Sequence, residues 1–326
     1  MNLSVVIPVY NEEATLASLF ARLYPALDAL GVAYEVIFVN DGSRDRSAAL
    51  LREQFARRPE ATRVVLLNGN FGQHMAIMAG FERTRGERVV TLDADLQNPP
   101  EEIARLLARM DEGYDYVGGV RAERHDNALR RVGSRAMNAL RRRITRIVMT
   151  DQGCMLRAYS RGVIDAINSC EEVNTFIPAL AYTFARNPTE VEVAHEPRAA
   201  GTSKYSLYSL IRLNFDLVTA FSVVPLQLFS LFGIGVAVLS VLVYLVVMVE
   251  RVLAGAPLDA LRTFWDRDIL QFFLTGIVLF GVGLVGEYVG RIYQQVRNRP
   301  RYLVQAVLEK DSSWQEAKRS SSATPR

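Results

Sequence analysis

The sequence predicts an α/β domain with a mostly parallel sheet, followed by two transmembrane helices. Over the first 120 residues, short runs rich in Val, Ile and Leu alternate with helical patterns, which is typical of a parallel sheet covered on both faces. Further along, residues 217–249 and 269–286 contain no Asp, Glu, Lys or Arg. Since a span needs about 20 apolar residues, we expect two transmembrane helices within residues 228–295.

The elements follow from hydrophobic periodicity. The expected strands are residues 3–8, 36–40, 64–68, 89–93, 154–158 and 191–195, and the expected helices are residues 12–30, 44–57, 72–84 and 162–167, with another starting near Pro100. Ligands of such sheets bind beyond the carboxyl ends of the strands. Four consecutive strand ends carry polar residues and glycines, at 10–12, 41–43, 68–70 and 93–95. These ends are therefore the candidate ligand site.

The strongest chemical signal is the pair Asp93 and Asp95 at the end of an apolar strand. Two carboxylates at this spacing can share one hard divalent cation, because Mg²⁺ and Mn²⁺ prefer oxygen ligands and keep coordination sites for substrate phosphates. Taken alone, the pair is equally compatible with two turn carboxylates, one of which caps the helix near Pro100. The loop around Asn70, Gly72 and Gln73 also suits a donor site, because a glycine lets the backbone approach a ligand closely before a helix N-terminus.

Composition excludes several classes of protein. With 38 Lys+Arg against 35 Asp+Glu in 326 residues, the chain is not a bulk polyanion binder. Two cysteines, Cys154 and Cys170, exclude a disulfide scaffold and a Cys₄ zinc site. His125 and His195 lack metal-site spacing, and His74 suits local packing. Residues 121–146 hold nine arginines, which fit both a phosphate site and a face against anionic lipid headgroups.

Three motifs in a fixed order carry a family resemblance. Residues 6–13 (VIPVYNEE), 39–43 (VNDGS) and 92–95 (LDAD) resemble the family 2 glycosyltransferases, which have the GT-A fold and use nucleotide-sugar donors. The resemblance covers about the first 160 residues. It implies a metal, Mg²⁺ or Mn²⁺, at Asp95 and Gln97. It also implies a UDP-sugar site that comprises Pro8, Tyr10, Asn11, Glu12, Asp41, Gly42, Ser43, Asn70, Gly72, Gln73 and Asp93.

Downstream motifs narrow the resemblance. Residues 151–159 (DQGCMLRAY), 175–178 (TFIP), 201–206 (GTSKYS) and 286–293 (GEYVGRIY) are similar to the polyprenyl-phosphate glycosyltransferases of that family, over nearly the whole chain. The runs GCMLRAY and VRNRPRYLVQAV are most similar to the branch that transfers 4-deoxy-4-formamido-L-arabinose to undecaprenyl phosphate, for lipid A modification and polymyxin resistance. The resemblance implies acceptor-phosphate contacts from Arg121, Arg135, Arg198 and Lys204.

The implied reaction is a single displacement with inversion at the anomeric carbon. The nucleophile is a phosphate oxygen whose second pKa lies near 6, so a strong general base is not required. Asp93, Asp95 and Asp151 are the candidate catalytic residues. Asp151 matches the position of a base in relatives that use hydroxyl acceptors, and three roles stay open for it: taking the last proton, orienting the acceptor, or shaping a turn.

The resulting organisation is a cytoplasmic GT-A domain at 1–205, an interfacial amphipathic helix at 206–227, two transmembrane helices with a short periplasmic loop at 228–295, and a cytoplasmic tail at 296–326 with a disordered end. Basic residues flank both spans, which favours cytoplasmic ends. We expect a multi-pass protein of the bacterial inner membrane, in contact with its lipids, with no nucleic-acid partner. Relatives form tetramers, so the resemblance also implies a homo-oligomer.

Three alternatives differ in substrate or class. The first alternative is an enzyme that transfers glucose, mannose or another sugar to a polyprenyl phosphate. The first 120 residues of such an enzyme would look much the same as those of this chain. A processive polysaccharide synthase predicts more spans and a QxxRW motif, which the sequence lacks. A membrane-anchored protein that binds anionic ligands through residues 121–146 predicts salt-dependent binding that survives loss of Asp93 and Asp95. That last reading leaves the four polar strand ends unexplained.

Overall fold

The computed structural model describes residues 1–121, 149–151, 153–170, 176–196, 226–233, 267–297 and 300–310, together with 235, 236, 238, 239, 242, 246 and 249. The chain forms two compact units. The first comprises residues 1–137, 147–204 and 299–326, and the second comprises residues 138–146 and 205–298. The expected interfacial helix at 206–227 and the end of the tail lie almost wholly outside the described residues.

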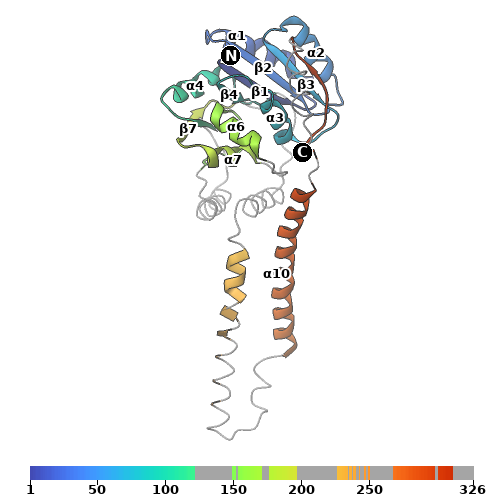
Figure 1. Cartoon of the computed structure of the whole chain (residues 1–326), viewed down its shortest axis with the longest axis vertical. Helices are drawn as coiled ribbons and strands as arrows, with labels where there is room; N and C mark the ends of the chain where they lie inside the picture. Colours follow the sequence, from blue (N-terminus) through green and yellow to red (C-terminus); the bar gives the residue numbers. More distant parts are fainter. Residues whose placement is uncertain are drawn as a thin grey trace, which may run out of the picture. The chain divides into compact units, whose positions relative to one another are not determined.

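The first unit is built on one sheet, which has eight strands in the described part of the chain (Figure 1). Their order is β7-β5-β6-β4-β1-β2-β3-β8. The strands are β1 (Leu3–Val9), β2 (Tyr34–Asn40), β3 (Thr62–Leu67), β4 (Arg88–Thr91), β5 (Tyr116–Arg121), β6 (Arg157–Ser160), β7 (Pro188–Val193) and β8 (Val304–Leu308). Pairs β1–β2, β1–β4, β2–β3 and β5–β7 are parallel, which confirms the predicted α/β fold with a mostly parallel sheet.

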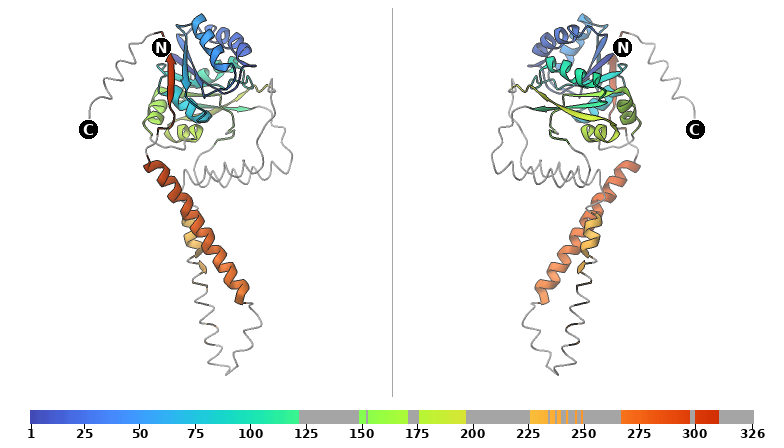
Figure 2. Two further views of the ribbon diagram at one scale, coloured as in Figure 1. Left: turned by 90° about the vertical axis from the view of Figure 1, so that its right-hand side faces the viewer. Right: turned by 90° about the vertical axis from the view of Figure 1, so that its left-hand side faces the viewer.

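Helices cover both faces of this sheet (Figures 1 and 2). On one face, α1 (Leu16–Asp28), α2 (Ser47–Arg57), the 3₁₀ turn η1 (Pro100–Glu102) and α4 (Ile103–Asp111) pack with the odd-numbered residues of β1 in the main core. On the other face lie α3 (Gln73–Phe81), α6 (Arg161–Ser169) and α7 (Ile177–Phe184). This double cover explains why β1 reads as a nearly continuous apolar run.

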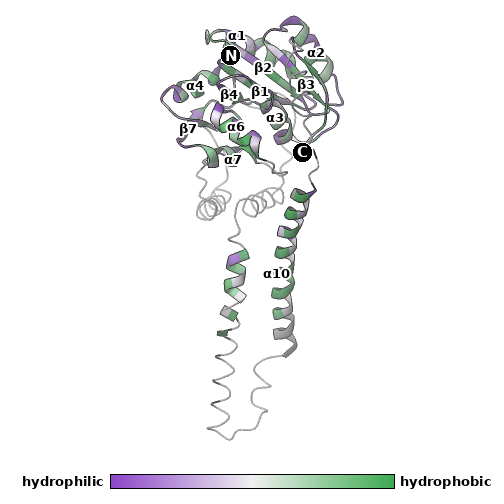
Figure 3. Ribbon diagram, viewed as in Figure 1, coloured by the Kyte–Doolittle hydropathy of each residue, from purple (hydrophilic) through white to green (hydrophobic). Residues whose placement is uncertain are grey.

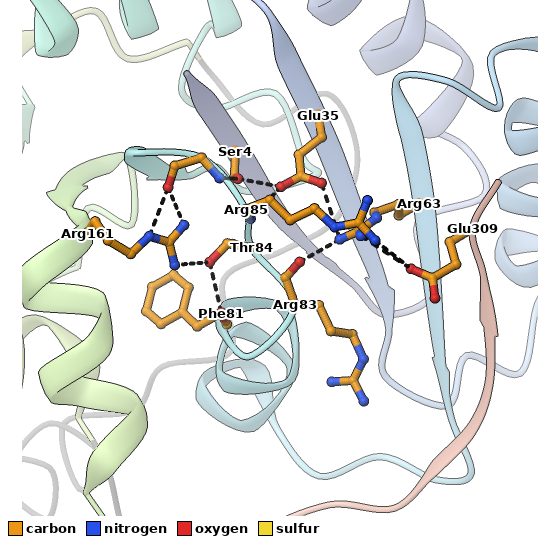
Figure 4. Close-up of polar contacts among 10 residues, drawn as sticks. Ser4, Glu35, Arg63, Phe81, Arg83, Thr84, Arg85, Arg161 and Glu309 are labelled. Carbon is orange, nitrogen blue, oxygen red and sulfur yellow. Dashed lines mark hydrogen bonds and ion pairs between the residues drawn. The ribbon is translucent and has the colours of Figure 1, made fainter. Parts of the chain in front are cut away.

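The sequence did not predict β8, which comes from the tail. Val304–Leu308 pairs antiparallel with β3 and completes the sheet edge. A buried ionic cluster fastens its end (Figure 4). Arg63 on β3 contacts Glu35 of β2 and Glu309 just after β8, each at 3.2 Å, and these side chains are at most 8% exposed. The first unit therefore includes a segment that follows the second unit in the chain.

In the second unit, residues 226–233 are helical and α10 (Arg267–Val296) has 30 residues. Many large apolar side chains of α10 are exposed, among them Leu279, Phe280 and Val282. Hydrophobic residues recur along most of this helix (Figure 3). Phe229 packs against Phe280, with ring centroids 5.7 Å apart. Within the described residues, we find no helix that is both long enough and apolar enough to cross a membrane.

Candidate active site

The sheet topology brings the predicted site residues to one edge. Strands β1, β2, β3, β4, β5 and β7 all run in the same direction, and β6 runs opposite to β4 and β5. The carboxyl ends of the six strands therefore meet at one edge, where the amino end of β6 also lies. That edge carries Tyr10, Asp41, Asp93 and Arg121, each directly at or after a strand, with Asp151 shortly before β6.

The loops that follow β1 and β2 hold each other in place. The backbone N–H of Asn11 donates to Oγ of Ser43 at 3.0 Å, and Oδ1 of Asn11 accepts from the backbone of Arg44 at 2.8 Å. Asn11 adopts the left-handed conformation, with φ 55°, which asparagine tolerates better than most residues. The backbone of Glu12 donates to Oγ of Ser47 at 2.9 Å. These contacts fix the two loops against each other. The Tyr10 side chain remains 43% exposed at the carboxyl end of β1.

Asp41 and Gly42 hold the predicted donor loop. The buried Asp41 carboxylate accepts hydrogen bonds from the backbone of Phe71 at 2.7 Å and of Gly72 at 2.9 Å. Burial raises the pKa of Asp41, and these two hydrogen bonds oppose the rise. A Cβ on Gly42 would lie 2.4 Å from the carbonyl carbon of Gly69, so only glycine fits here. Asp41 thus shapes the 69–72 loop through contacts that the motif did not reveal.

The acidic turn after β4 is preorganised. Nε2 of Gln73 donates to Oδ1 of Asp93 at 2.7 Å, which links the donor loop to this turn. Oδ1 of Asp95 accepts from the backbone of Gln97 at 3.1 Å, and Leu96 between them has φ 59°. The Asp95 and Gln97 oxygens suit a hard cation that takes its remaining ligands from a diphosphate. Among the described residues, no group of three or more His, Cys, Asp or Glu forms a complete metal site.

Arg121 and Asp151 form a second cluster on the same edge. Nε of Arg121 donates to Oδ2 of Asp151 at 2.6 Å, and Nη2 donates to Oδ1 at 2.9 Å. The Asp151 carboxylate is 1% exposed and also accepts from the backbone of Gly153 at 3.0 Å. Fully buried Arg157 donates to the Asp151 carbonyl at 2.6 Å. The geometry makes Asp151 the anchor of the Arg121 guanidinium.

The sequence assigned no role to two residues that lie at this edge. His195 follows β7, and its pKa is lowered, first by burial and next by the nearby charge of Arg121, against the opposing influence of Asp151 and Asp95. The backbone of Glu196 donates to the carbonyl of Gln97 at 2.8 Å. The sequence signal that could have found them was their position at the end of a predicted strand, residues 191–195, by the same rule that identified the other four strand ends.

Comparison with known proteins identifies the family. Residues 4–167 match the family described as glycosyl transferase family 2. The chain belongs to this family. It is 51% identical over 305 residues, covering 94% of this chain and 90% of the relative, to the undecaprenyl-phosphate 4-deoxy-4-formamido-L-arabinose transferase of Pseudomonas aeruginosa strain LESB58. The enzyme of that name from Shewanella sediminis is 49% identical over 306 residues, covering 94% of this chain and 92% of the relative.

Solved structures also resemble this family 2 glycosyltransferase. Glucosyl-3-phosphoglycerate synthase from Mycobacterium tuberculosis, in complex with phosphoglyceric acid, aligns with a TM-score of 0.47 and 20% identity, covering 68% of this chain and 78% of that one.

Part of the predicted acceptor site of this glycosyltransferase lies outside the described residues, namely Arg135, Arg198 and Lys204. A cavity of about 380 Å³ opens on the face of the sheet that α2 covers, and Gly42, Ser43 and Asn70 line it together with Arg44 and Arg52. Asp93 and Asp95 do not line this cavity, so it is separate from the acidic turn.

Proposed function

We propose that the protein transfers 4-deoxy-4-formamido-L-arabinose from its UDP donor to undecaprenyl phosphate, for lipid A modification and polymyxin resistance. About 50% identity to transferases named for this reaction, over more than nine-tenths of the chain, supports the choice of sugar and acceptor. The observation that carries the chemistry is that one sheet edge holds both the acidic turn at Asp93–Asp95 and the Arg121–Asp151 pair.

The donor binds across the ends of β1, β2 and β4 in this proposal. Tyr10 and the 69–72 loop contact the nucleotide, and Asp93 contacts the sugar nucleotide. Asp95 and Gln97 would hold Mg²⁺ or Mn²⁺, since both supply oxygen ligands and Asp95 is already fixed by the Gln97 backbone. When bound, such an ion neutralises charge on the leaving diphosphate.

The acceptor phosphate is held by Arg121, with Arg135, Arg198 and Lys204 as further contacts from the undescribed segments. Guanidinium groups suit phosphate oxygens because their N–H groups form a planar fork. Two N–H groups of Arg121 are already directed at Asp151, which fixes the direction of the remaining ones. Catalysis then rests on orientation of two anionic substrates and on charge neutralisation. Asp151 contributes as an anchor for Arg121 in this mechanism.

The lipid acceptor requires contact with a bilayer. We propose that residues 228–295 supply two transmembrane helices, that residues 206–227 lie in the interface, and that the catalytic unit faces the cytoplasm of the inner membrane. The exposed apolar side chains of α10 and the uncharged runs in the sequence support this arrangement. A homo-oligomer, with a tetramer as the expected size, is tested by light scattering of the protein in detergent.

A donor panel tests the proposal. Purified full-length protein is incubated with undecaprenyl phosphate and one donor at a time: UDP-4-deoxy-4-formamido-L-arabinose, UDP-glucose or GDP-mannose. The extracted lipids are analysed by mass spectrometry. We expect a new lipid only with the formamido sugar. A product only with glucose or mannose would replace the proposed sugar, and no product with any donor would contradict transfer to this acceptor.

A further inference from the structure

Arg22 joins two carboxylates that come from distant parts of the chain. It lies on α1, and its guanidinium is one-third exposed. Nε and Nη2 donate to the two oxygens of Glu101 at 3.1 and 3.0 Å, and Nη1 and Nη2 donate to the two oxygens of Glu196 at 2.9 and 3.0 Å. Both edges of the guanidinium are therefore engaged in bidentate contacts, the strongest geometry available to an arginine.

These contacts close a ring around the acidic turn. Glu101 is the second residue of η1 and lies four residues after Gln97 in the chain. Glu196 donates its backbone N–H to the carbonyl of Gln97 at 2.8 Å. A path therefore runs from Gln97 along the turn to Glu101, through the Arg22 guanidinium to Glu196, and back to Gln97. Arg22 is the member of this ring that is not on the turn or on the segment after β7.

The two parts that Arg22 joins have different roles in the proposed reaction. The turn at Asp95–Gln97 serves the donor side. Glu196 stands two residues before Arg198 and eight before Lys204, which we assigned to the acceptor phosphate. Glu196 also follows His195, which lies close enough to Arg121 for the charge of Arg121 to lower the pKa of His195. How Glu196 is held against the turn therefore bears on the placement of the acceptor side at Arg121 relative to the donor side. In transfer reactions a displacement of about 1 Å at the reacting groups lowers the rate by roughly a hundredfold.

We propose that Arg22 is a positioning residue that holds the chain at His195 and Glu196, on the side of the Arg121–Asp151 acceptor pair, against the metal-binding turn. This inference rests on the proposed function and assigns a role to a residue on the outer helix α1, outside the sequence motifs. Without the guanidinium, the carboxylates of Glu101 and Glu196 have no shared cation and repel each other. The repulsion moves the Glu196 side chain away from Glu101 and loosens the contact between Glu196 and the turn. A lysine at position 22 does not replace the guanidinium, because its single ammonium group cannot make bidentate contacts to two carboxylates.

The Arg22→Gln variant distinguishes a role of Arg22 in positioning the acceptor site from a role in stabilising the fold. Solvent screens these partly exposed ion pairs, so Arg22→Gln should lower the melting temperature only slightly. Its effect should fall on the acceptor: we expect KM for undecaprenyl phosphate to rise roughly tenfold while KM for the UDP-sugar stays within about twofold. Arg22→Lys should lie between wild type and Arg22→Gln. Glu196→Gln should reproduce the acceptor defect, and the double variant should be no worse than either single variant.

The matched control is Arg58→Gln. Arg58 donates through Nη1 and Nη2 to the exposed carboxylate of Asp28, the last residue of α1, and has a similar exposure of 42%. Steady-state kinetics and melting curves of the full-length protein are measured for every variant, with both substrates varied. Unchanged acceptor KM in Arg22→Gln, or equal rises in both KM values together with a lower melting temperature, would overturn the inference. Absence of transfer by the wild type would overturn the proposed function as well.

Discussion

Arg121 grips Asp151 through two parallel hydrogen bonds, from Nε to Oδ2 at 2.6 Å and from Nη2 to Oδ1 at 2.9 Å. The backbone N–H groups of Gly153 and Arg121 add two further donors to the same carboxylate, at 3.0 and 3.4 Å. A carboxylate held by several donors in a fixed orientation is a good anchor. Of the three roles that the sequence left open for Asp151, the contacts therefore favour orientation of the acceptor through Arg121.

We predict that Asp151→Asn raises KM for undecaprenyl phosphate about tenfold and leaves the shape of the pH–rate profile unchanged, because the variant loses the anchor and no titrating base. Initial rates between pH 5.5 and 9 measure this. The double variant Arg121→Lys/Asp151→Asn should be less impaired than the sum of the single variants. A kcat that falls by orders of magnitude with loss of the acidic limb of the profile would instead make Asp151 the base.

Gly42 offers a test of the donor loop. Gly42→Ala would place a Cβ 2.4 Å from the carbonyl carbon of Gly69, at a residue with φ 66°. We expect Tm to fall and UDP binding, measured by calorimetry, to weaken by at least tenfold, because the loop held by Asp41 must move. Gly31→Ala is the control, since Gly31 has φ 64° and no atom within 4 Å of the new Cβ. It should cost about 1 kcal/mol from backbone strain alone and leave UDP binding intact. Equal behaviour of the two variants would refute the close-approach argument.

The ionic cluster around Arg63 predicts that the tail segment stabilises the catalytic unit. Glu309→Gln removes one partner of a buried pair, and we expect it to lower the free energy of unfolding by about 3 kcal/mol. Glu60→Gln removes an exposed carboxylate that pairs with Lys310, and it should leave the free energy of unfolding nearly unchanged, because solvent screens the pair. Urea unfolding in detergent, followed by circular dichroism, measures both. If the two variants unfold alike, β8 is not held by this cluster.

His74 predicts a pH dependence of stability. Burial, and then the nearby charge of Arg157, lowers the pKa of His74 from 6.5 to about 4. Between these values the unfolded chain binds a proton at His74 and the folded protein does not, so stability falls as the pH drops from 6.5 towards 4. From pH 7 to pH 5 this site alone should cost about 2 kcal/mol.

His74→Phe should remove that loss while the contributions of other groups remain. Urea unfolding of wild type and variant at pH 7 and pH 5 gives the comparison. The ring of Phe176, 5.2 Å from the imidazole, offers an aromatic surface that can accept the new side chain. The same loss of stability in both proteins would show that His74 does not titrate as its burial implies.

Periodicity predicted the first half of the fold well, and long-range contacts account for the rest. The apolar runs ending near Val9, Asn40, Leu67 and Thr91 became strands of nearly the predicted extent, because their side chains are buried on both faces. The run at 154–158 instead begins its strand at Arg157, since the preceding residues turn around the buried Arg157 guanidinium, which donates to the Cys154 carbonyl at 2.7 Å. β8 escaped prediction because pairing with β3, a contact over more than 200 residues, creates it.

The candidate site was also predicted only in part: the sequence identified several of its residues but not the contacts between them. Strand ends identified Tyr10, Asp41 and Asp93, because parallel topology alone carries them to one edge. Arg121 came from the family resemblance, since β5, the strand that ends at Arg121, was not predicted. The partners of those residues could not be predicted from the sequence, because loop conformations leave no periodic signal. This applies to the hydrogen bonds from Phe71 and Gly72 to Asp41 and to the bidentate Arg121–Asp151 contact. His195 and Glu196 carried only the weak signal of following a strand.

The most direct test of the account is the mass of the lipid formed by wild type, Asp95→Asn and Asp111→Asn with UDP-4-deoxy-4-formamido-L-arabinose, undecaprenyl phosphate and Mn²⁺, each with and without a chelator. Asp111 is exposed and pairs with Arg88 away from the acidic turn, so it controls for loss of one carboxylate. The account predicts glycosylated lipid from wild type and Asp111→Asn, no product with chelator, and a loss of at least a hundredfold in Asp95→Asn. Undiminished product from Asp95→Asn, or from the wild type in chelator, would contradict it.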